Sequence, residues 1–396
     1  MRTGPSQEEV RRQNLGALLR YVHLHGPTSR AELTSALGLN RSTIGALTAD
    51  RAAAGLGSVA APRQAGRAGR AGRPSLVVRP ESARIYAYAF SIEVDRLRAA
   101  RVGLGGQILD LRTDDRPPGL PAADAAPLLA EFVKELHQAT PDGGVYVGGG
   151  VSVCRMMRRE DGTPRLTFGV DEIAQPLCDE LAAAIGTARP VVAGNAADVA
   201  ALAEHVRGTA VGCDDLLYLH RDAGVDAGII VAGRRLTGHT GQGGHVGHMV
   251  VKPGGRPCGC GSRGCWETEI GEYALLTAAG RDATGGRSSA LAVVDAASRG
   301  DASAQAAIRQ VGDWLGLGVA NLVNIFNPEM VIFGGTLREV YLAAAAQVRS
   351  RLNATALPAA RERVRLRTPQ LGEDAALIGA AELAFEQLLA DPLAFS

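Results

Sequence analysis

Apolar residues near the N-terminus recur at helical spacing and predict a small group of helices. Across residues 9–25 Val10, Leu15, Leu18, Leu19 and Val22 recur near helical spacing, and Gly26-Pro27 then ends the predicted helix. Ser29 and Glu32 form a capping-box pattern that starts a second helix, which ends at Gly38. This alternation of helix and turn predicts a compact helical unit at the start of the chain.

A third helix is expected directly after the glycine turn. Asn40 can cap it, and Arg41, Ser42 and Thr43 then occupy its first turn. Helix, short turn and helix form the helix-turn-helix pattern, in which the N-terminal residues of the second helix enter the major groove of DNA. We therefore expect Arg41, Ser42 and Thr43 to contact DNA, although two short helices about a glycine also occur in ordinary bundles.

Two short apolar runs follow at 57–61 and 76–78, and the segment between them is rich in arginine and glycine. Two strands joined by such a tip predict a wing beside the helix-turn-helix. Arginine side chains favour the negative potential of a narrow minor groove. Arg67, Arg70 and Arg73 are therefore predicted to contact phosphates or the minor groove.

After residue 80 the apolar pattern becomes typical of strands, and a similar order of elements occurs twice. Two similar α/β halves with a cleft between them indicate the actin-like, sugar-kinase superfold. The predicted fold class is therefore α/β, two halves of this superfold preceded by a winged helix-turn-helix. The predicted elements are the strands 85–90, 96–102, 107–111, 144–153, 215–220, 228–231 and 330–333, a strand after Gly233-Arg234-Arg235, and the helix 126–138.

Composition adds a division of charge to this picture. The 396 residues are 46% hydrophobic and 21% charged, which excludes disorder, collagen and small disulfide scaffolds. The net charge of +1 conceals twelve arginines and four acidic residues in 1–80, or +8, against 30 basic and 37 acidic residues afterwards, or −7. A basic head on an acidic body is typical of binding to a phosphate backbone, the alternative being a solvated arginine-rich face. Together with the helix-turn-helix and the wing, this charge predicts binding to double-stranded DNA.

The polar N-terminus lacks a signal-peptide pattern, and no apolar stretch is long enough to span a bilayer. We therefore expect a cytoplasmic protein with no membrane partner. Six cysteines are too few for a disulfide framework in a chain of this length. Three of them lie within eight residues, which in a reducing compartment indicates a metal site.

The segment 245–267 contains the most specific motif of the chain. It reads His245-Val246-Gly247-His248, then Cys258-Gly259-Cys260, then Cys265-Trp266-Glu267. One imidazole and three thiolates can close a tetrahedral zinc site, and four protein ligands leave no open position, so the Zn²⁺ is expected to be structural. The alternative is three reduced cysteines in a loop. The other cysteines, Cys154, Cys178 and Cys213, are interpreted as ordinary buried thiols.

At these residues the chain resembles the ROK family of repressors and sugar kinases. The head is similar in Ser29-Arg30-Ala31-Glu32-Leu33 and Gly72-Arg73-Pro74, and the body in Asn327-Pro328-Glu329 followed by Gly334-Gly335. Gly247-His248, the three cysteines and Glu267 match the zinc signature of the family. The resemblance implies a winged helix-turn-helix domain over 1–80 and a kinase-like ROK domain over 81–396. It also implies the ligand set His248, Cys258, Cys260 and Cys265.

The parts that would transfer a phosphoryl group depart from the family pattern. The base in the kinases is the aspartate of an Asn-Asp pair, and here Ala196 follows Asn195. The two glycine turns for ATP phosphates read Ser91-Ile92-Glu93-Val94-Asp95 and 222–228, with carboxylates where glycines are expected. Each carboxylate would repel a triphosphate by about 1 kcal/mol or more. We therefore predict that the chain is not an enzyme, the alternative being an active ATP-dependent sugar kinase with a DNA-binding head.

The sugar pocket is partly preserved by comparison with the family. Asn195, His248 and Glu267 match residues that contact sugar hydroxyls in relatives, but His245 stands where a glutamate is expected. With Arg155, His245 would suit an anionic ligand, so the expected effector is a sugar or sugar phosphate, the alternative being a decayed pocket without a ligand. Because His248 can contact both metal and ligand, occupancy of the pocket could move the segment 245–267, which we call the metal loop, and, through it, the heads.

These features predict a DNA-binding transcriptional regulator of the repressor type. The kinase-like body would supply dimerisation and ligand sensing, as a homodimer or a tetramer. A two-fold dimer reads paired half-sites, so the operator is expected to be an inverted repeat. A third interpretation is a scaffold that binds another protein through the body, which the sequence neither supports nor excludes.

Overall fold

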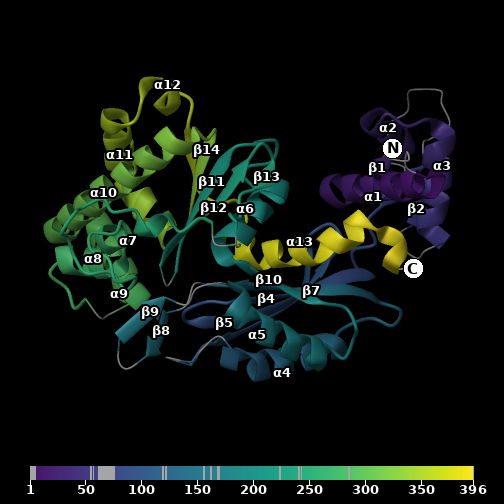
Figure 1. Ribbon diagram of the computed structural model, residues 1–396, viewed down its shortest axis with the longest axis horizontal. Coiled ribbons are helices and arrows are strands. Elements are labelled where there is room, and N and C mark those ends of the chain that lie inside the picture. Colours follow the sequence, from purple (N-terminus) through teal and green to yellow (C-terminus); the bar gives the residue numbers. More distant parts are fainter. Residues whose placement is uncertain are drawn as a thin grey trace.

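The computed structural model shows a body of two α/β halves with a smaller head at one end (Figure 1). We call the elements α1 to β3 the head and the elements from β4 onward the body. The structure describes residues 6–53, 56, 58–60, 76–117, 120, 123–154, 157–160, 163–166, 170–222, 224–239, 241, 243–283 and 286–395.

The head contains the three predicted helices. Helix α1 (Gln7–His25) is capped by Ser6. Helix α2 (Arg30–Leu37) is capped by Ser29, whose hydroxyl accepts the Glu32 N–H. Helix α3 (Arg41–Ala53) is capped as expected, because Asn40 Oδ1 accepts the Thr43 N–H at 2.8 Å. The reciprocal capping box occurs at α1, between Ser6 and Glu9, whereas at α2 only the serine half is present. The helices enclose a core of Leu15, Leu18, Val22, Leu33, Ile44, Leu47 and Val78.

A three-stranded sheet in the order β1-β3-β2 completes the head. Strands β2 (Ser58–Ala60) and β3 (Val77–Arg79) were predicted, and β1 (Thr28–Ser29) was missed. Strand β1 is only two residues long and exists through its pairing with β3, so no apolar run announces it. Three helices with this small sheet form the winged helix-turn-helix arrangement.

The first half of the body is built on the sheet β10-β7-β4-β5-β6. Strands β4, β5 and β6 form an antiparallel meander, and β7 and β10 extend it in parallel. Helices α4 and α5 cover one face and α13 covers the other. The bounds are β4 (Ile85–Ile92), β5 (Arg96–Gly103), β6 (Ile108–Asp115), β7 (Val145–Val153), β10 (Val191–Asn195), α4 (Ala126–Gln138), α5 (Val170–Ile185) and α13 (Ala375–Ala390), with a separate hairpin of β8 (Met157–Glu160) and β9 (Thr163–Leu166).

The second half repeats this strand order as β13-β12-β11-β14-β15, which confirms the predicted duplication. One prediction within it was wrong: the third strand is Arg234–Arg235 itself and does not follow it. Ala232 and Gly233 make the hairpin turn, with φ of 50° and 72°, so the chain turns earlier than the sequence indicated. The bounds are β11 (Leu216–Arg221), β12 (Val225–Val231), β13 (Arg234–Arg235), β14 (Met330–Gly335), β15 (Arg365–Arg367), α6 (Ala196–Arg207), α7 (Glu267–Ile270), α8 (Glu272–Ala278), α9 (Gly286–Ser298), α10 (Ala302–Phe326), α11 (Leu337–Thr355) and α12 (Pro358–Arg361).

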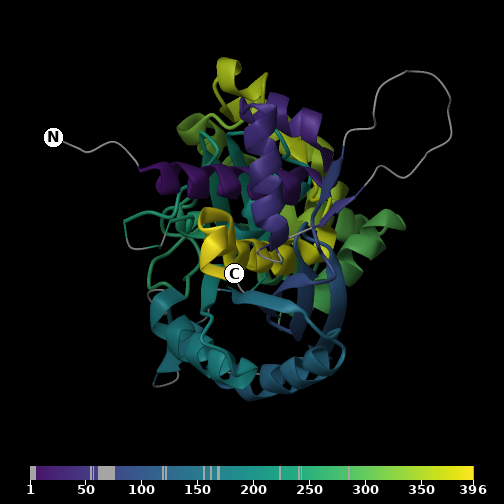
Figure 2. The same ribbon diagram turned by 90° about the vertical axis from the view of Figure 1, so that its right-hand side faces the viewer.

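Two helices lie between the halves and lead towards the head. Helix α13 packs on the first sheet and α6 on the second, and the two pack on one another (Figure 1). The head rests on α13, as Figure 2 shows from that end of the molecule. Leu19 of α1 is buried with Phe385 and Leu388 of α13, and a Cβ at Gly16 would lie 2.7 Å from the carbonyl oxygen of Leu389. None of the described helices has the length and apolar character required to cross a bilayer.

Candidate functional site

The residues predicted to read the major groove lie on the surface of the head. Arg41 and Ser42 are exposed in the first turn of α3, and Thr43 is half-buried. The Ser42 hydroxyl donates to Asn40 Oδ1 at 2.7 Å, which fixes it at the helix start. Arg67, Arg70 and Arg73, predicted for the wing, lie outside the described residues.

The residues predicted to hold a metal lie together. The ligand atoms of His248, Cys258, Cys260 and Cys265 lie within 4.8 Å of one another. Cys260 Sγ and Cys265 Sγ are 3.6 Å apart, far beyond the roughly 2.05 Å of a disulfide and close to the roughly 3.8 Å edge of a tetrahedral zinc–thiolate site. Three soft thiolates and one imidazole form a donor set that suits a tetrahedral metal such as zinc.

Local packing holds this metal loop in place. Gly264 allows the two backbone segments of the loop to approach one another closely, because a Cβ there would lie 1.7 Å from the Lys252 carbonyl oxygen. The following Trp266 is fully buried against α10, and its indole N–H donates to the Trp314 carbonyl at 2.8 Å. The loop lies near α7, at the opposite end of the long axis from the head (Figure 1). Among the described elements the loop therefore offers no direct contact through which it could move the head.

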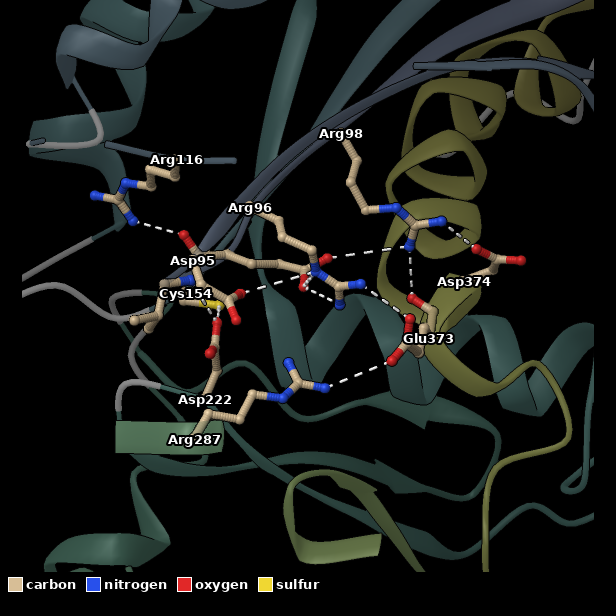
Figure 3. Close-up of polar contacts among 11 residues, drawn as sticks. Asp95, Arg96, Arg98, Arg116, Cys154, Asp222, Arg287, Glu373 and Asp374 are labelled. Atoms are coloured by element: carbon tan, nitrogen blue, oxygen red, sulfur yellow. Dashed lines mark hydrogen bonds and ion pairs between the residues drawn. The ribbon is translucent and has the colours of Figure 1, made fainter. Parts of the chain in front are cut away.

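A cavity of about 600 Å³ lies in the cleft between the halves, where the resemblance places ATP. Glu373, just before α13, accepts a hydrogen bond from Arg96 of β5 at 3.0 Å and pairs with Arg287 of α9 at 3.5 Å. Arg98 donates to the Glu373 carbonyl at 2.9 Å and pairs with Asp374. Figure 3 shows this network across the start of α13. Ion pairs thus connect both halves to the N-terminus of one helix.

A second bridge connects the two turns that correspond to the phosphate turns. Asp222, at the end of β11, accepts from the Val94 N–H at 3.1 Å and from the Cys154 thiol at 2.7 Å (Figure 3). Burial and the Asp222 carboxylate raise the pKa of Cys154, so the thiol keeps its proton and donates it. Burial also raises the pKa of Glu93, although Arg96 opposes this effect at 2.7 Å. Asp222 therefore bonds to the first half across the cleft, whereas Glu93 pairs with Arg96 within the first half.

The position expected for the catalytic base carries a methyl group. Ala196 is the first residue of α6 and lies on the wall of the cavity, directly after Asn195, which caps the helix. Asp198 is directed away from it, since its carboxylate binds Arg235 at 2.8 Å. Asp198 is therefore held by Arg235 and is not among the residues that line the cavity, so it does not take the place of the base.

Asn195 and His245 are brought together by Asp226, a residue the sequence placed in the phosphate turn. Asp226 Oδ1 lies 3.0 Å from His245 Nδ1, and Asp226 Oδ2 lies 3.4 Å from Asn195 Nδ2. The space left beside Asn195 is about 10 Å³, hardly one water molecule. Beside the cysteine cluster, His248 Nδ1 lies 3.6 Å from Glu267 Oε1. The carboxylate opposite His245 counters the predicted preference for an anion there, and Arg155 lies outside the described residues.

A larger space lies on the other side of Glu267. This cavity of about 370 Å³ is lined by residues of several elements, among them Arg221 of β11, Arg256 of the metal loop, Thr268 of α7 and Tyr273 of α8. Arg256 lies over the ring of the exposed Tyr273, 5.9 Å from its centroid. The sequence indicated this cavity only through the metal motif, whose residues Cys258, Gly259 and Glu267 form one of its walls.

Two halves of equal strand order around a cleft, with a Cys₃His cluster in the second half, define a sugar-kinase-like protein that carries an additional helical head. The chain belongs to the ROK family, whose sequence profile matches residues 91–387. It is 33% identical to a glucokinase of Halalkalibacterium halodurans over 215 residues, 51% of this chain and 65% of that protein. It is 24% identical to a xylose repressor of Bacillus spizizenii over 97% of both chains. The crystal structure of a ROK family transcriptional regulator, a homologue of the E. coli MLC protein, superposes with a TM-score of 0.75 at 25% identity, covering 97% of this chain and 98% of that one.

Proposed function

We propose that this protein is a transcriptional repressor that binds double-stranded DNA through its head. The observation that carries the proposal is the exposed first turn of α3, with Arg41 and Ser42, on a three-helix unit with a small sheet. End-to-end similarity to a xylose repressor supports it. We assign the DNA-binding domain to 1–80, with Arg67, Arg70 and Arg73 at its wing, and the ROK domain to 81–396.

We propose further that the body does not phosphorylate sugars. Ala196 cannot accept a proton, and loss of a general base alone typically lowers a rate by about 10²–10⁴-fold. The bonds of Asp222 to Val94 and Cys154 join the two turns that the resemblance assigns to the ATP phosphates, which supports this proposal. Similarity to a glucokinase keeps an active kinase as the alternative.

The Cys₃His cluster is proposed to hold a structural Zn²⁺. His248, Cys258, Cys260 and Cys265 would supply all four positions of a tetrahedral ion, which leaves none for water or substrate. The bound ion would hold the metal loop, and therefore Glu267, against the cavity of about 370 Å³.

The effector is proposed to be a sugar or a sugar phosphate. Because the space beside Asn195 is about 10 Å³, such a ligand must open the Asp226–His245 contact or occupy the cavity beyond Glu267. We also propose a homodimer or tetramer, since paired heads would read an inverted-repeat operator.

A footprint of the purified protein on genomic DNA fragments, at low ionic strength, tests the DNA-binding proposal. Protection of an inverted repeat whose halves lie whole helical turns apart is the expected result. A coupled assay with ATP and a panel of hexoses tests the kinase alternative on the same preparation. Turnover of ATP with any hexose, or absence of protection on every fragment, would overturn the proposal.

A further inference from the structure

A buried group of three charged or polar side chains lies where the head meets both halves of the body. His23 belongs to α1 of the head, Glu382 to α13 on the first sheet, and Arg207 to the last turn of α6 on the second sheet. His23 is 1% exposed and Glu382 is 5% exposed. None of these residues was predicted as a site from the sequence, in which they lie up to 359 positions apart.

The hydrogen bonds of this group fix the orientation of each member. The Gly105 N–H donates to His23 Nδ1 at 3.0 Å, and His23 Nε2 lies 2.8 Å from Glu382 Oε2 and 2.5 Å from Arg207 Nη2. Arg207 Nε donates to Glu382 Oε1 at 2.6 Å. Arg207 Nη1 also donates to the carbonyls of His23, at 3.1 Å, and Gly105, at 2.7 Å. Arg207 therefore binds the head and the first half simultaneously.

The ionised state of Glu382 agrees with this geometry. Burial alone would raise its pKa, but the hydrogen bonds with His23 and Arg207 and the charge of Arg207 outweigh burial and lower the pKa to about 2. A buried ion pair of this kind is rarely more stabilising than apolar side chains of the same size. Its particular property is that it is satisfied in one orientation only, because a small displacement leaves a buried charge without its partner.

Arg207 lies on α6 and Glu382 on α13, and both of these helices begin at the cleft. Ala196 at the start of α6 and Ala375 at the start of α13 line the cavity of about 600 Å³. Arg207 lies eleven residues after Ala196 along α6, a distance of about 16 Å. The two helices pack closely, since a Cβ at Gly379 would lie 1.9 Å from the Val199 carbonyl oxygen. A shift of one half against the other at the cleft therefore moves Arg207 relative to Glu382.

We propose that Arg207, Glu382 and His23 are positioning residues that orient the DNA-binding head according to the relative position of the two halves. The inference rests on the proposed DNA-binding function and assigns its regulation to α6 and α13, away from the metal loop. When the halves shift, Arg207 moves with the second half while Glu382 stays with the first, and His23 loses one of its partners. The head then leaves the orientation in which paired heads match an operator.

The first test measures the head without DNA. Amide hydrogen exchange of the full-length protein is followed by mass spectrometry on peptides from residues 15–25. Glu382→Gln should accelerate exchange there by about tenfold or more, because α1 loses its buried anchor. Asp110→Asn is the matched control, since Asp110 also pairs with a buried arginine, Arg101, but on β6 and away from α1, α6 and α13. Equal exchange in Glu382→Gln and wild type would overturn the proposal.

The second test measures transmission from the cleft. Asp222→Asn, which weakens the bridge to Cys154 and Val94, is combined with Glu382→Gln. Affinity for the footprinted DNA fragment is measured for the wild type, each single variant and the double variant. Independent effects of distant sites multiply within about a factor of two. We expect Asp222→Asn to change the affinity in the wild-type background and to have little effect in Glu382→Gln. Multiplicative effects, or no effect of Asp222→Asn alone, would overturn the transmission.

A second variant and a second measurement cover the cases in which Glu382→Gln does not fold or the wild type does not bind DNA. If Glu382→Gln does not fold, Arg207→Lys keeps the charge beside Glu382 but loses the bonds to the His23 and Gly105 carbonyls, and should show the same localised exchange. If wild type binds no fragment, the DNA-binding proposal fails, and hydrogen exchange in Asp222→Asn with and without Glu382→Gln still decides whether the cleft affects α1.

Discussion

Replacing Cys265 with serine should remove the metal and leave the rest of the fold in place. Cys260 Sγ and Cys265 Sγ are 3.6 Å apart, and a regular tetrahedron with that edge has its centre about 2.2 Å from each vertex, close to the roughly 2.3 Å of a Zn–S bond. The purified wild type is therefore expected to contain about one Zn²⁺ per chain, with an X-ray absorption shell of three sulfurs near 2.3 Å and one nitrogen near 2.0–2.1 Å.

The matched control is Cys178→Ser. Cys178 and Cys265 are both buried free thiols, so each substitution buries a hydroxyl in place of a thiol at a cost of about 1–3 kcal/mol. Only Cys265→Ser should lose the metal, and its melting temperature should fall further than that of Cys178→Ser, since the loop holding Trp266 is no longer tied. Equal zinc content in Cys265→Ser and Cys178→Ser, or a shell without nitrogen, would refute the assigned ligand set.

Arg41→Ala should weaken operator binding and reduce the slope of log K against log salt by about 0.9 for each phosphate that Arg41 neutralises, as measured by titration at several salt concentrations; an unchanged slope would exclude binding of Arg41 to a phosphate. Ala196→Asp should not produce hexose-dependent ATP turnover, because Asp222 still bridges the phosphate turns, and turnover in the coupled assay would show that only the base was missing. Glu382→Gln should destabilise the protein at pH 7 by about 3 kcal/mol, from a pKa lowered from 4.5 to about 2 at about 1.36 kcal/mol per unit. This contribution exists above about pH 4.5 and disappears as the pH falls towards 2, so urea unfolding of the variant and wild type should converge in that window, and a constant difference would contradict it.

Elements with a local physical cause could be predicted from the sequence. The helix 126–138 was located at its observed bounds from its apolar period, and Asn40 was recognised as a cap because its side chain serves an amide three residues away. The strands 85–90, 96–102, 107–111 and 144–153 of the first half followed in the same way from apolar runs and glycine turns, whereas β13 of the second half was misplaced and β15 was not predicted. The cluster of His248 with three cysteines was predictable because its spacing is short and its chemistry restricts the choice.

Elements created by contacts between distant segments could not be predicted. Strand β1 exists only because Thr28 and Ser29 pair with a strand almost fifty positions later. His23 sits at the end of an amphipathic helix, where a polar residue type favours a solvent-facing position, and only the fold places Glu382 and Arg207 beside it. Asp226 could be noticed in the sequence as a departure from a glycine, but its direction towards His245 depends on the hairpin of β11 and β12.

The carboxylates that replace glycines at the cleft illustrate this difference most clearly. Considered along the sequence, Glu93 and Asp222 are obstacles to ATP, and each would oppose a phosphate by about 1 kcal/mol or more. In the folded protein Asp222 joins the two halves through Val94 and Cys154, and Glu93 pairs with Arg96, which also holds the start of α13 through Glu373. The proposed loss of nucleotide binding and the bonds around the cleft would therefore be two effects of the same side chains. Such bonds keep the halves together in the absence of a nucleotide, and they act on α13, the helix on which the head rests.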